Sequence, residues 1–275
     1  MNYSETTADT SKRASSSVRG FQAGTARVLV FESATDLTAA AAARAADLII
    51  GAVQRKGHAR VIAATGNSQK AFIDRLVLDN KVPWNRVTLF HMDEYVGISA
   101  AHPASFRLWI RTRIAGRVHP KETYYIEGDA SDVNAEARRY ENLLLSDEID
   151  LAFVGIGENG HIAFNDPPVA DFNDPKIVKR VALDDACKRQ QAGEGHFENV
   201  EAVPNEALTI TCPGLFRANA WITVVPDERK AEAVLGALEG PITTACPASI
   251  IRRHPNATVY LDRFSASRLN KNEGQ

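Results

Sequence analysis

The sequence predicts an α/β fold, a Rossmann-like three-layer α/β/α sandwich with a mostly parallel sheet. Short apolar runs alternate along the chain with segments of helical periodicity, which is typical of βαβ units. Polar, glycine-containing turns follow several apolar runs, and open α/β sheets bind ligands beyond the carboxyl ends of their strands. The 275 residues suit one large domain or two small ones, and the lack of a clear internal linker favours one.

The predicted elements have recognisable boundaries. The first helix, over residues 35–56, is rich in alanine, is capped near Ser33 or Asp36 and stops before Gly57. Apolar runs predict strands, and Pro103 is placed at the start of a later helix. Strands are expected at 28–31, 60–64, 87–91, 123–126, 149–154, 176–183, 207–211, 221–225 and 258–261, and helices at 35–56, 69–79, 103–114, 132–145 and 227–238.

Composition divides the chain into three segments. Residues 1–26 are rich in Ser, Thr, Ala and Gly and lack apolar periodicity, so we expect a flexible N-terminal tail that is too short for a helix-turn-helix domain. Residues 27–265 carry the alternating pattern and are expected to form a single domain. Residues 266–275 are expected to form a C-terminal tail.

Composition also argues against several classes of protein. The formal net charge is −2 without a basic run, so we expect no nucleic-acid partner. No apolar run approaches the roughly 18 residues of a membrane helix, and no secretory signal stands at the amino end, so we expect no membrane association and a cytoplasmic location. Cys187, Cys212 and Cys246 are widely spaced without a C-x-x-C pair, which indicates reduced thiols.

Metal, triphosphate and serine-hydrolase motifs are missing from the sequence. His91, His102 and His119 are not spaced at i,i+4 with a carboxylate, as a zinc helix requires, so we expect no metal site. The chain has no G-x-x-x-x-G-K-[ST] motif, which argues against a nucleoside triphosphate. It has no G-x-S-x-G motif either, which argues against a serine hydrolase.

The most informative segment is 149–167, where an apolar strand ends in a glycine-punctuated turn. His161 lies in this turn, close in sequence to Glu158, Asn159 and Asp166. A histidine titrates near neutral pH and nearby carboxylates can orient it, so the turn is a candidate for acid–base chemistry. The alternative interpretation is a histidine that only holds the turn by hydrogen bonds.

Residues 155–160 of this turn also satisfy the dinucleotide-binding pattern G-x-G-x-x-G. That pattern needs a helix that begins at the third glycine and faces a pyrophosphate. Pro167 and Pro168 follow too soon for a long helix. Asp174, near the offset of the ribose-binding acid, stands in a polar turn. We therefore expect no nicotinamide or flavin cofactor.

Three further groups of polar residues flank predicted strands and helices. Residues 65–68 (Thr-Gly-Asn-Ser) lie between a strand and a helix and could bind a phosphate, or form an ordinary turn capped by Ser68. Asp93 and Glu94 follow the strand at 87–91, where a carboxylate can remove a proton alpha to a carbonyl; the alternative is a solvated acidic turn. Lys230, in the first turn of a helix, could equally be a solvent-exposed charge.

Together these segments strongly resemble the glucosamine-6-phosphate deaminase (isomerase) family. The resemblance rests on residues 90–97 (Phe-His-Met-Asp-Glu-Tyr-Val-Gly), 102–105, 155–167 and 203–209, with the turn at 64–68, and covers roughly residues 27–265. The same fold family includes 6-phosphogluconolactonases and the effector domains of some sugar-sensing repressors. The Gly-His-Ile-Ala-Phe-Asn segment is more similar to the deaminases.

The resemblance implies a cofactor-independent isomerisation of an amino-sugar phosphate with loss of ammonia. Glucosamine 6-phosphate, or a close epimer, would give fructose 6-phosphate or its epimer. Asp93 would move the proton between C2 and C1, and His161, with Asn159 and Asp166 as its partners, would open the pyranose ring. The positions that match substrate-binding residues are Thr65, Gly66, Asn67, Ser68, Glu94, His196 and Lys230.

Three positions depart from the family pattern. Some members have aspartate at Asn159, most have glutamate at Asp166, and our alignment places Gly195 or His196 where an arginine clamps the phosphate. Two alternatives therefore stay open. One is another sugar-phosphate isomerase or a 6-phosphogluconolactonase-type hydrolase, and the other is a non-catalytic sugar-phosphate sensor. The sequence also leaves open whether the chain forms a homo-oligomer.

Overall fold

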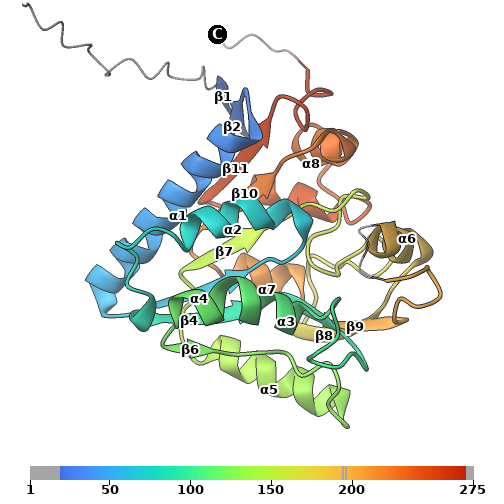
Figure 1. Ribbon diagram of the computed structural model, residues 1–275. Helices are drawn as coiled ribbons and strands as arrows, with labels where there is room; N and C mark the ends of the chain where they lie inside the picture. Colours follow the sequence, from blue (N-terminus) through green and yellow to red (C-terminus); the bar gives the residue numbers. More distant parts are fainter. Residues whose placement is uncertain (1–18, 194, 196, 271–275) are drawn as a thin grey trace, which may run out of the picture.

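The computed structural model describes residues 19–193, 195 and 197–270. Its strands are β1 (Arg19–Ala23), β2 (Ala26–Phe31), β3 (Ala59–Ala63), β4 (Val87–His91), β5 (Asp93–Tyr95), β6 (Glu122–Thr123), β7 (Leu151–Val154), β8 (Val178–Ala182), β9 (Glu206–Ile210), β10 (Trp221–Val225) and β11 (Ala257–Asp262). In this part of the chain, eight strands form one sheet in the order β1-β2-β11-β10-β7-β3-β4-β6 (Figure 1). Neighbouring strands in it are parallel except β1 and β2.

The helices connect these strands. They are α1 (Ala34–Lys56), α2 (Lys70–Leu76), α3 (Phe106–Ile110), α4 (Gly116–Val118), α5 (Val133–Leu145), α6 (Asp185–Gly193), α7 (Cys212–Phe216) and α8 (Ala231–Leu238), with the short helical segments η1 (Asn67–Gln69), η2 (Trp84–Arg86), η3 (Arg111–Ala115), η4 (Glu228–Lys230) and η5 (Pro247–Arg253). The long helix α1 begins one residue before the predicted start and ends at the predicted residue. Ser33 caps its first turn by accepting from the N–H of Asp36, and Gly57 ends it with a left-handed φ of 81°.

Alternate side chains of the central strands build the two halves of the core. Val61 and Leu89 pack on one face with buried residues of α1 and α2. Their neighbours Ile62 and Phe90 pack on the other face with buried residues of α5, α7 and α8. Because successive residues of a strand point to opposite faces, this alternation places helices on both sides of the sheet. The predicted three-layer α/β/α sandwich with a mainly parallel sheet is confirmed.

A smaller antiparallel sheet, in the order β5-β9-β8, lies beside the main one. Its first strand, β5, follows β4 after a single residue, Met92, and pairs with β9 so that Asp93 faces Thr209. β5 was not predicted, because three residues are too few to show alternation. α6 and α7 were not predicted either, since α6 is mostly polar and α7 spans one short turn.

Several predicted boundaries were wrong. The helix predicted at 103–114 begins at Phe106, because Ser105 rather than Pro103 supplies the cap: its hydroxyl accepts from the N–H of Leu108. The strand predicted at 123–126 has two residues, Glu122 and Thr123. Among the described helices, none is both long and apolar enough to cross a membrane.

Part of each predicted tail lies in the packed structure of the described residues. Residues 19–23 form β1, which pairs with β2 in a hairpin that closes with Gly24 at φ 59°. At the other end, Leu269 is buried, and its N–H donates to the carbonyl of Ala266. Residues 1–18 and 271–275, the remainder of both predicted tails, lie outside the described residues.

A pair of truncations measures what β1 contributes. Deleting residues 1–24 should lower the melting temperature relative to deleting residues 1–18, because only the longer deletion removes the ladder between β1 and β2. For a chain of this size, each 1 kcal/mol lost corresponds to about 2–4 °C. Thermal unfolding of the two proteins side by side gives the difference. Equal melting temperatures would show that β1 contributes nothing to stability.

Candidate active site

The loops that follow β4, β3, β7 and β10 meet at the carboxyl edge of the sheet. In chain order, β3, β4 and β6 extend the sheet in one direction, whereas β7, β10 and β11 extend it in the other. β3 and β7 are neighbours, so the order of the strands reverses between them. Open α/β sheets bind ligands at such a switch point. Residues 65–68 follow β3 and residues 155–161 follow β7, so two of the predicted clusters lie there.

A single pocket at this edge contains most of the predicted site. Its empty volume, with the open mouth included, is about 600 Å³. The turn at 65–68, Asp93, His161 and Lys230 all line it, although they follow different strands. The lining residues are Ala64, Thr65, Gly66, Asn67, Ser68, Met92, Asp93, Phe106, Gly155, Ile156, Gly157, His161, Ala163, Phe164, Gln190, Gln191 and Lys230.

The glycines of the β7 turn make room for His161. A Cβ on Gly157 would lie only 2.2 Å from the imidazole ring, and Gly160 has a left-handed φ of 83°. The turn closes with hydrogen bonds from the N–H of Gly157 to the carbonyl of His161, and from the N–H of Gly160 to the carbonyl of Gly157. The G-x-G-x-x-G pattern therefore seats a histidine ring here and does not begin a helix.

His161 pairs with a buried carboxylate. Its Nδ1 lies 3.0 Å from Oδ1 of Asp166, which also accepts from Nδ2 of Asn159 at 2.7 Å. Burial works to raise the pKa of Asp166, but His161 and Asn159 outweigh it and hold this pKa below its usual value. Since a carboxylate only accepts, the arrangement favours a proton on Nδ1 of His161. Asp166 is buried behind the ring, out of the pocket lining.

Asn159 was expected to contact the imidazole ring of His161 directly, but it contacts the backbone of His161 instead. Its Oδ1 accepts from the backbone N–H of His161 at 3.0 Å, and its Nδ2 donates to Asp166. Asn159 therefore orients the imidazole indirectly, through the turn and through the carboxylate. Its side chain lies outside the lining of the main pocket and borders a neighbouring surface hollow instead.

Asp93 is 7% exposed and lies at the start of β5. Burial is the main cause that raises its pKa well above the usual value, and the negative charges of Glu94 and Asp166 add to the effect. β9 ties this residue to the His161 turn: Thr209 pairs with Asp93 in the small sheet, and its hydroxyl accepts from the N–H of Phe164 at 3.1 Å. A carboxyl group with a raised pKa in a pocket is typical of general acid–base catalysis.

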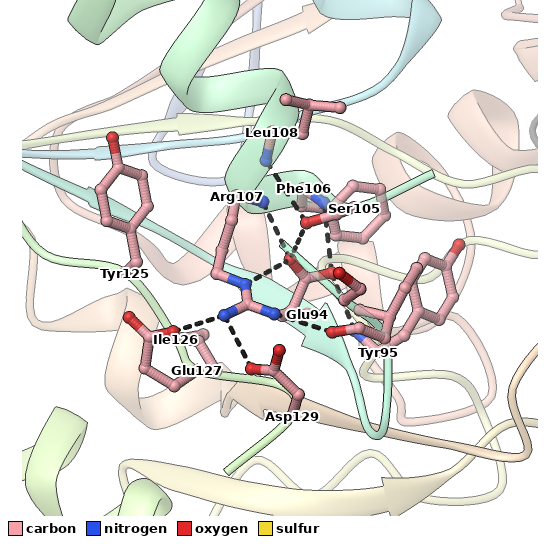
Figure 2. Close-up of polar contacts among 12 residues, drawn as sticks. Glu94, Tyr95, Ser105, Phe106, Arg107, Leu108, Tyr125, Ile126, Glu127 and Asp129 are labelled. Atoms are coloured by element: carbon pink, nitrogen blue, oxygen red, sulfur yellow. Dashed lines mark hydrogen bonds and ion pairs between the residues drawn. The ribbon is translucent and has the colours of Figure 1, made fainter. Parts of the chain in front are cut away.

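Glu94, expected to bind substrate, does not line the pocket. It is fully buried and caps α3 (Figure 2). Its carboxylate accepts from the backbone N–H groups of Tyr95, Phe106 and Arg107 and from the hydroxyl of Ser105 at 2.7 Å. Strand alternation explains this placement, because a side chain next to Asp93 in a strand points to the opposite face.

The guanidinium of Arg107 completes this network. It lies 3.4 Å from Glu94 and contacts Glu127 and Asp129 on the segment after β6, while it also donates to the carbonyl of Ile98 at 2.7 Å (Figure 2). Arg107 is 2% exposed, so this is a buried charge that is paired with carboxylates. The network joins β5, α3 and the 126–129 segment, and so it braces the strand that carries Asp93.

The turn at 65–68 and Lys230 both line the pocket. Gly66 adopts a φ of 97° and precedes η1, so Ser68 lies inside this short helix and is not its N-cap. Lys230 is 7% exposed and ends η4, which Asp227 caps by accepting from the N–H of Arg229 at 3.0 Å. Asp227 has a φ of 88°, a strained value for a residue with a side chain.

Two glutamines of α6 complete the pocket and were not predicted. Oε1 of Gln190 accepts from the N–H of Glu158 at 3.1 Å, and Oε1 of Gln191 accepts from the hydroxyl of Tyr95 at 2.7 Å. The surrounding sequence is polar and has no apolar periodicity, so it did not indicate that these two glutamines line a pocket. His196, a predicted phosphate contact, lies outside the described residues. The described residues hold no cluster of three or more His, Cys, Asp or Glu that could bind a metal.

The raised pKa of Asp93 predicts the acid limb of the pH profile. A base must be deprotonated, so kcat/KM should fall with decreasing pH, at a higher pH than the value of about 3.9 for ordinary aspartate. Glu94→Gln removes a neighbouring negative charge that raises the pKa of Asp93, so it should move this limb to lower pH. Titration of any group on the substrate is common to both proteins and cancels in the comparison. If both proteins stay folded and the acid limb lies at the same pH in both, Asp93 is not the group that titrates there.

The sequence and the fold are both similar to those of known glucosamine-6-phosphate deaminases. A family model described as glucosamine-6-phosphate isomerases/6-phosphogluconolactonase matches residues 32–260. A glucosamine-6-phosphate deaminase of Exiguobacterium sibiricum is 37% identical over 206 residues, which cover 75% of this chain and 79% of that protein. The solved structure of a monomeric glucosamine-6-phosphate deaminase superposes with a TM-score of 0.79 at 30% identity, over 87% of this chain and 98% of the other.

A 6-phosphogluconolactonase from Shewanella baltica is also similar in structure. It superposes with a TM-score of 0.69 over 86% of this chain and 96% of its own, at 17% sequence identity. At that identity the likeness shows a shared fold alone.

Proposed function

Because the chain belongs to the glucosamine-6-phosphate isomerase/6-phosphogluconolactonase family, we propose that it is an amino-sugar-phosphate deaminase. It converts glucosamine 6-phosphate, or a close epimer, to fructose 6-phosphate or its epimer, with release of ammonia. The observation that carries the proposal is the lining of one pocket by Asp93, His161, Lys230 and the turn at 65–68. A base, an imidazole, and a turn and a lysine that can bind a phosphate are the groups that this reaction needs.

His161 opens the sugar ring. Nδ1 faces the carboxylate of Asp166 at 3.0 Å, so Nε2 is the ring nitrogen that takes the proton of the anomeric hydroxyl. The same nitrogen returns a proton to the ring oxygen as the C1–O5 bond breaks, which leaves an aldehyde at C1. The negative charge of Asp166 stabilises the transient imidazolium.

Asp93 then moves a proton from C2 to C1. The aldehyde acidifies the C2–H, and the carboxylate removes it to give an enolamine. Return of the proton to C1 produces a ketimine at C2, and water adds to this carbon to release ammonia and leave the ketose. The raised pKa of Asp93 makes its carboxylate a stronger base than an exposed one, as proton removal from carbon requires.

Substrate specificity is the most direct test of this proposal. The purified protein should release ammonia and form a ketose phosphate from glucosamine 6-phosphate, and should not hydrolyse 6-phosphogluconolactone. The epimeric mannosamine and galactosamine 6-phosphates show which configuration is accepted. Lactone hydrolysis without ammonia release would favour the lactonase alternative, and binding without turnover would favour a sensor.

Lys230 should contribute binding rather than chemistry. It is the only lysine or arginine among the described residues that line the pocket. Lys230→Met should raise KM for the phosphorylated sugar by about 10- to 100-fold, the usual value of a charge-assisted hydrogen bond, with a smaller effect on kcat. Arg229→Met, an exposed neighbour in η4, is the matched control and should leave KM nearly unchanged. Equal effects of the two changes would argue against a phosphate contact at Lys230.

A further inference from the structure

A second histidine, His91, contacts the backbone of the candidate base Asp93 and has no role in the steps above. It is the last residue of β4 and is fully buried. Its main chain is fixed by α5, because the hydroxyl of Tyr140 donates to the carbonyl of His91 and accepts from its N–H, both at 2.9 Å. The imidazole therefore projects from a rigid point of the sheet.

Both ring nitrogens of His91 bond to the main chain. Nδ1 lies 2.9 Å from the backbone carbonyl oxygen of Asp93, and Nε2 lies 2.9 Å from the backbone nitrogen of Ile126. A backbone carbonyl can only accept, and a backbone N–H can only donate. Nδ1 must therefore carry the proton and Nε2 must not. An imidazolium, or the other neutral tautomer, would set two N–H groups against each other at Ile126.

We propose that His91, as a neutral Nδ1–H imidazole, is a positioning residue that holds the backbone carbonyl of Asp93 through Nδ1 and so sets the place of the base, while the bond from Ile126 to Nε2 fixes the tautomer of the ring. For the role of Asp93 this inference rests on the proposed function. The base must reach two neighbouring carbons, C2 and C1, with one carboxylate. A misplacement of about 1 Å in such a group can cost about 10²-fold in rate.

The surroundings of the ring keep it neutral. Burial lowers the pKa of His91 to about 3, and the positive charge of Arg107 acts in the same direction, against the hydrogen bond to the Asp93 carbonyl. The rings of Tyr125 and Tyr140 lie about it, with centroids at 6.0 and 6.1 Å. Both ring nitrogens of His91 are thus used in hydrogen bonds to the backbone, whereas Nε2 of His161 faces the pocket.

Two substitutions separate the bonds that His91 makes. The amide of His91→Asn reaches the position of Nδ1 and can still donate to the Asp93 carbonyl. The amide of His91→Gln reaches the position of Nε2 and keeps the bond to Ile126 instead. We expect the Asn variant to retain most of kcat, and the Gln variant to lose about 10- to 100-fold in kcat with little change in KM. Equal kcat in both variants, high or low, would overturn the proposal, as would a more active Gln variant.

Nitrogen-15 spectra of histidine-labelled wild-type protein give a readout that does not depend on activity. One ring, identified by its loss in a His91 variant, should show a protonated Nδ1 and a bare Nε2, unchanged between about pH 5 and 8. Protonation at Nε2, or titration within this range, would overturn the proposal. A wild-type protein that releases no ammonia would refute the proposed function, and the spectra would still decide the state of His91.

Discussion

Asp93→Asn should lower kcat by at least about 10²–10⁴-fold, the usual contribution of a general acid–base residue. The amide keeps the shape of the side chain but cannot take a proton from C2. Substrate binding should be largely retained, because residues 65–68 and Lys230 are untouched. Exchange of the C2 proton with solvent should disappear for both the cyclic and the open-chain sugar. Steady-state kinetics and proton exchange by NMR measure the two effects.

Stability separates this result from simple misfolding. Burial disfavours the charged form of Asp93, which raises its pKa, and asparagine has no charge to bury. The variant should therefore melt at the same temperature as the wild type or higher. Loss of activity together with a lower melting temperature would point to a structural role, and full activity would refute the mechanism.

His161→Gln should be almost inactive on the cyclic substrate and far less impaired on a sugar that cannot close its ring. Gln cannot carry a proton from the anomeric hydroxyl to the ring oxygen, so ring opening loses its catalyst. An acyclic analogue enters after that step. Turnover of the two substrates, and exchange of the C2 proton in each, give the comparison.

Asp166→Asn is the matched control for His161. It removes the charge that faces Nδ1 at 3.0 Å but keeps the imidazole in place. It should share the preference for the acyclic sugar in weaker form, because an amide orients the ring without stabilising imidazolium. Equal losses on cyclic and acyclic substrates in both variants would refute the separate role of His161.

The sequence was most informative where local pattern decides structure. Ser33 and Gly57 set the ends of α1 as expected, and β4 and β10 have the predicted bounds. The turn at 65–68, Asp93 and His161 follow parallel strands, so the order of elements alone suggested that they meet at one edge of the sheet. The structure brings them into one pocket.

Other features depend on tertiary contacts that no local pattern encodes. β1 is a strand only because it pairs with β2, and its residues carry no strong apolar signal. Glu94 is next to Asp93 in the sequence, which suggested that both carboxylates face the site. Because side chains alternate along a strand, Glu94 points instead toward Arg107 and the start of α3. Gln190 and Gln191 reach the pocket because α6 packs over it, and nothing in their local sequence indicates this.

The path of the C2 proton tests the central claim most directly. Glucosamine 6-phosphate is converted in D₂O, and both ammonia and the isotope content at C1 of the ketose are measured by NMR. The mechanism predicts one ammonia for each ketose formed, hydrogen or deuterium delivered to C1 on a single face, and loss of both signals in Asp93→Asn. Ketose formed without ammonia, or C1 labelling that persists in Asp93→Asn, would contradict it.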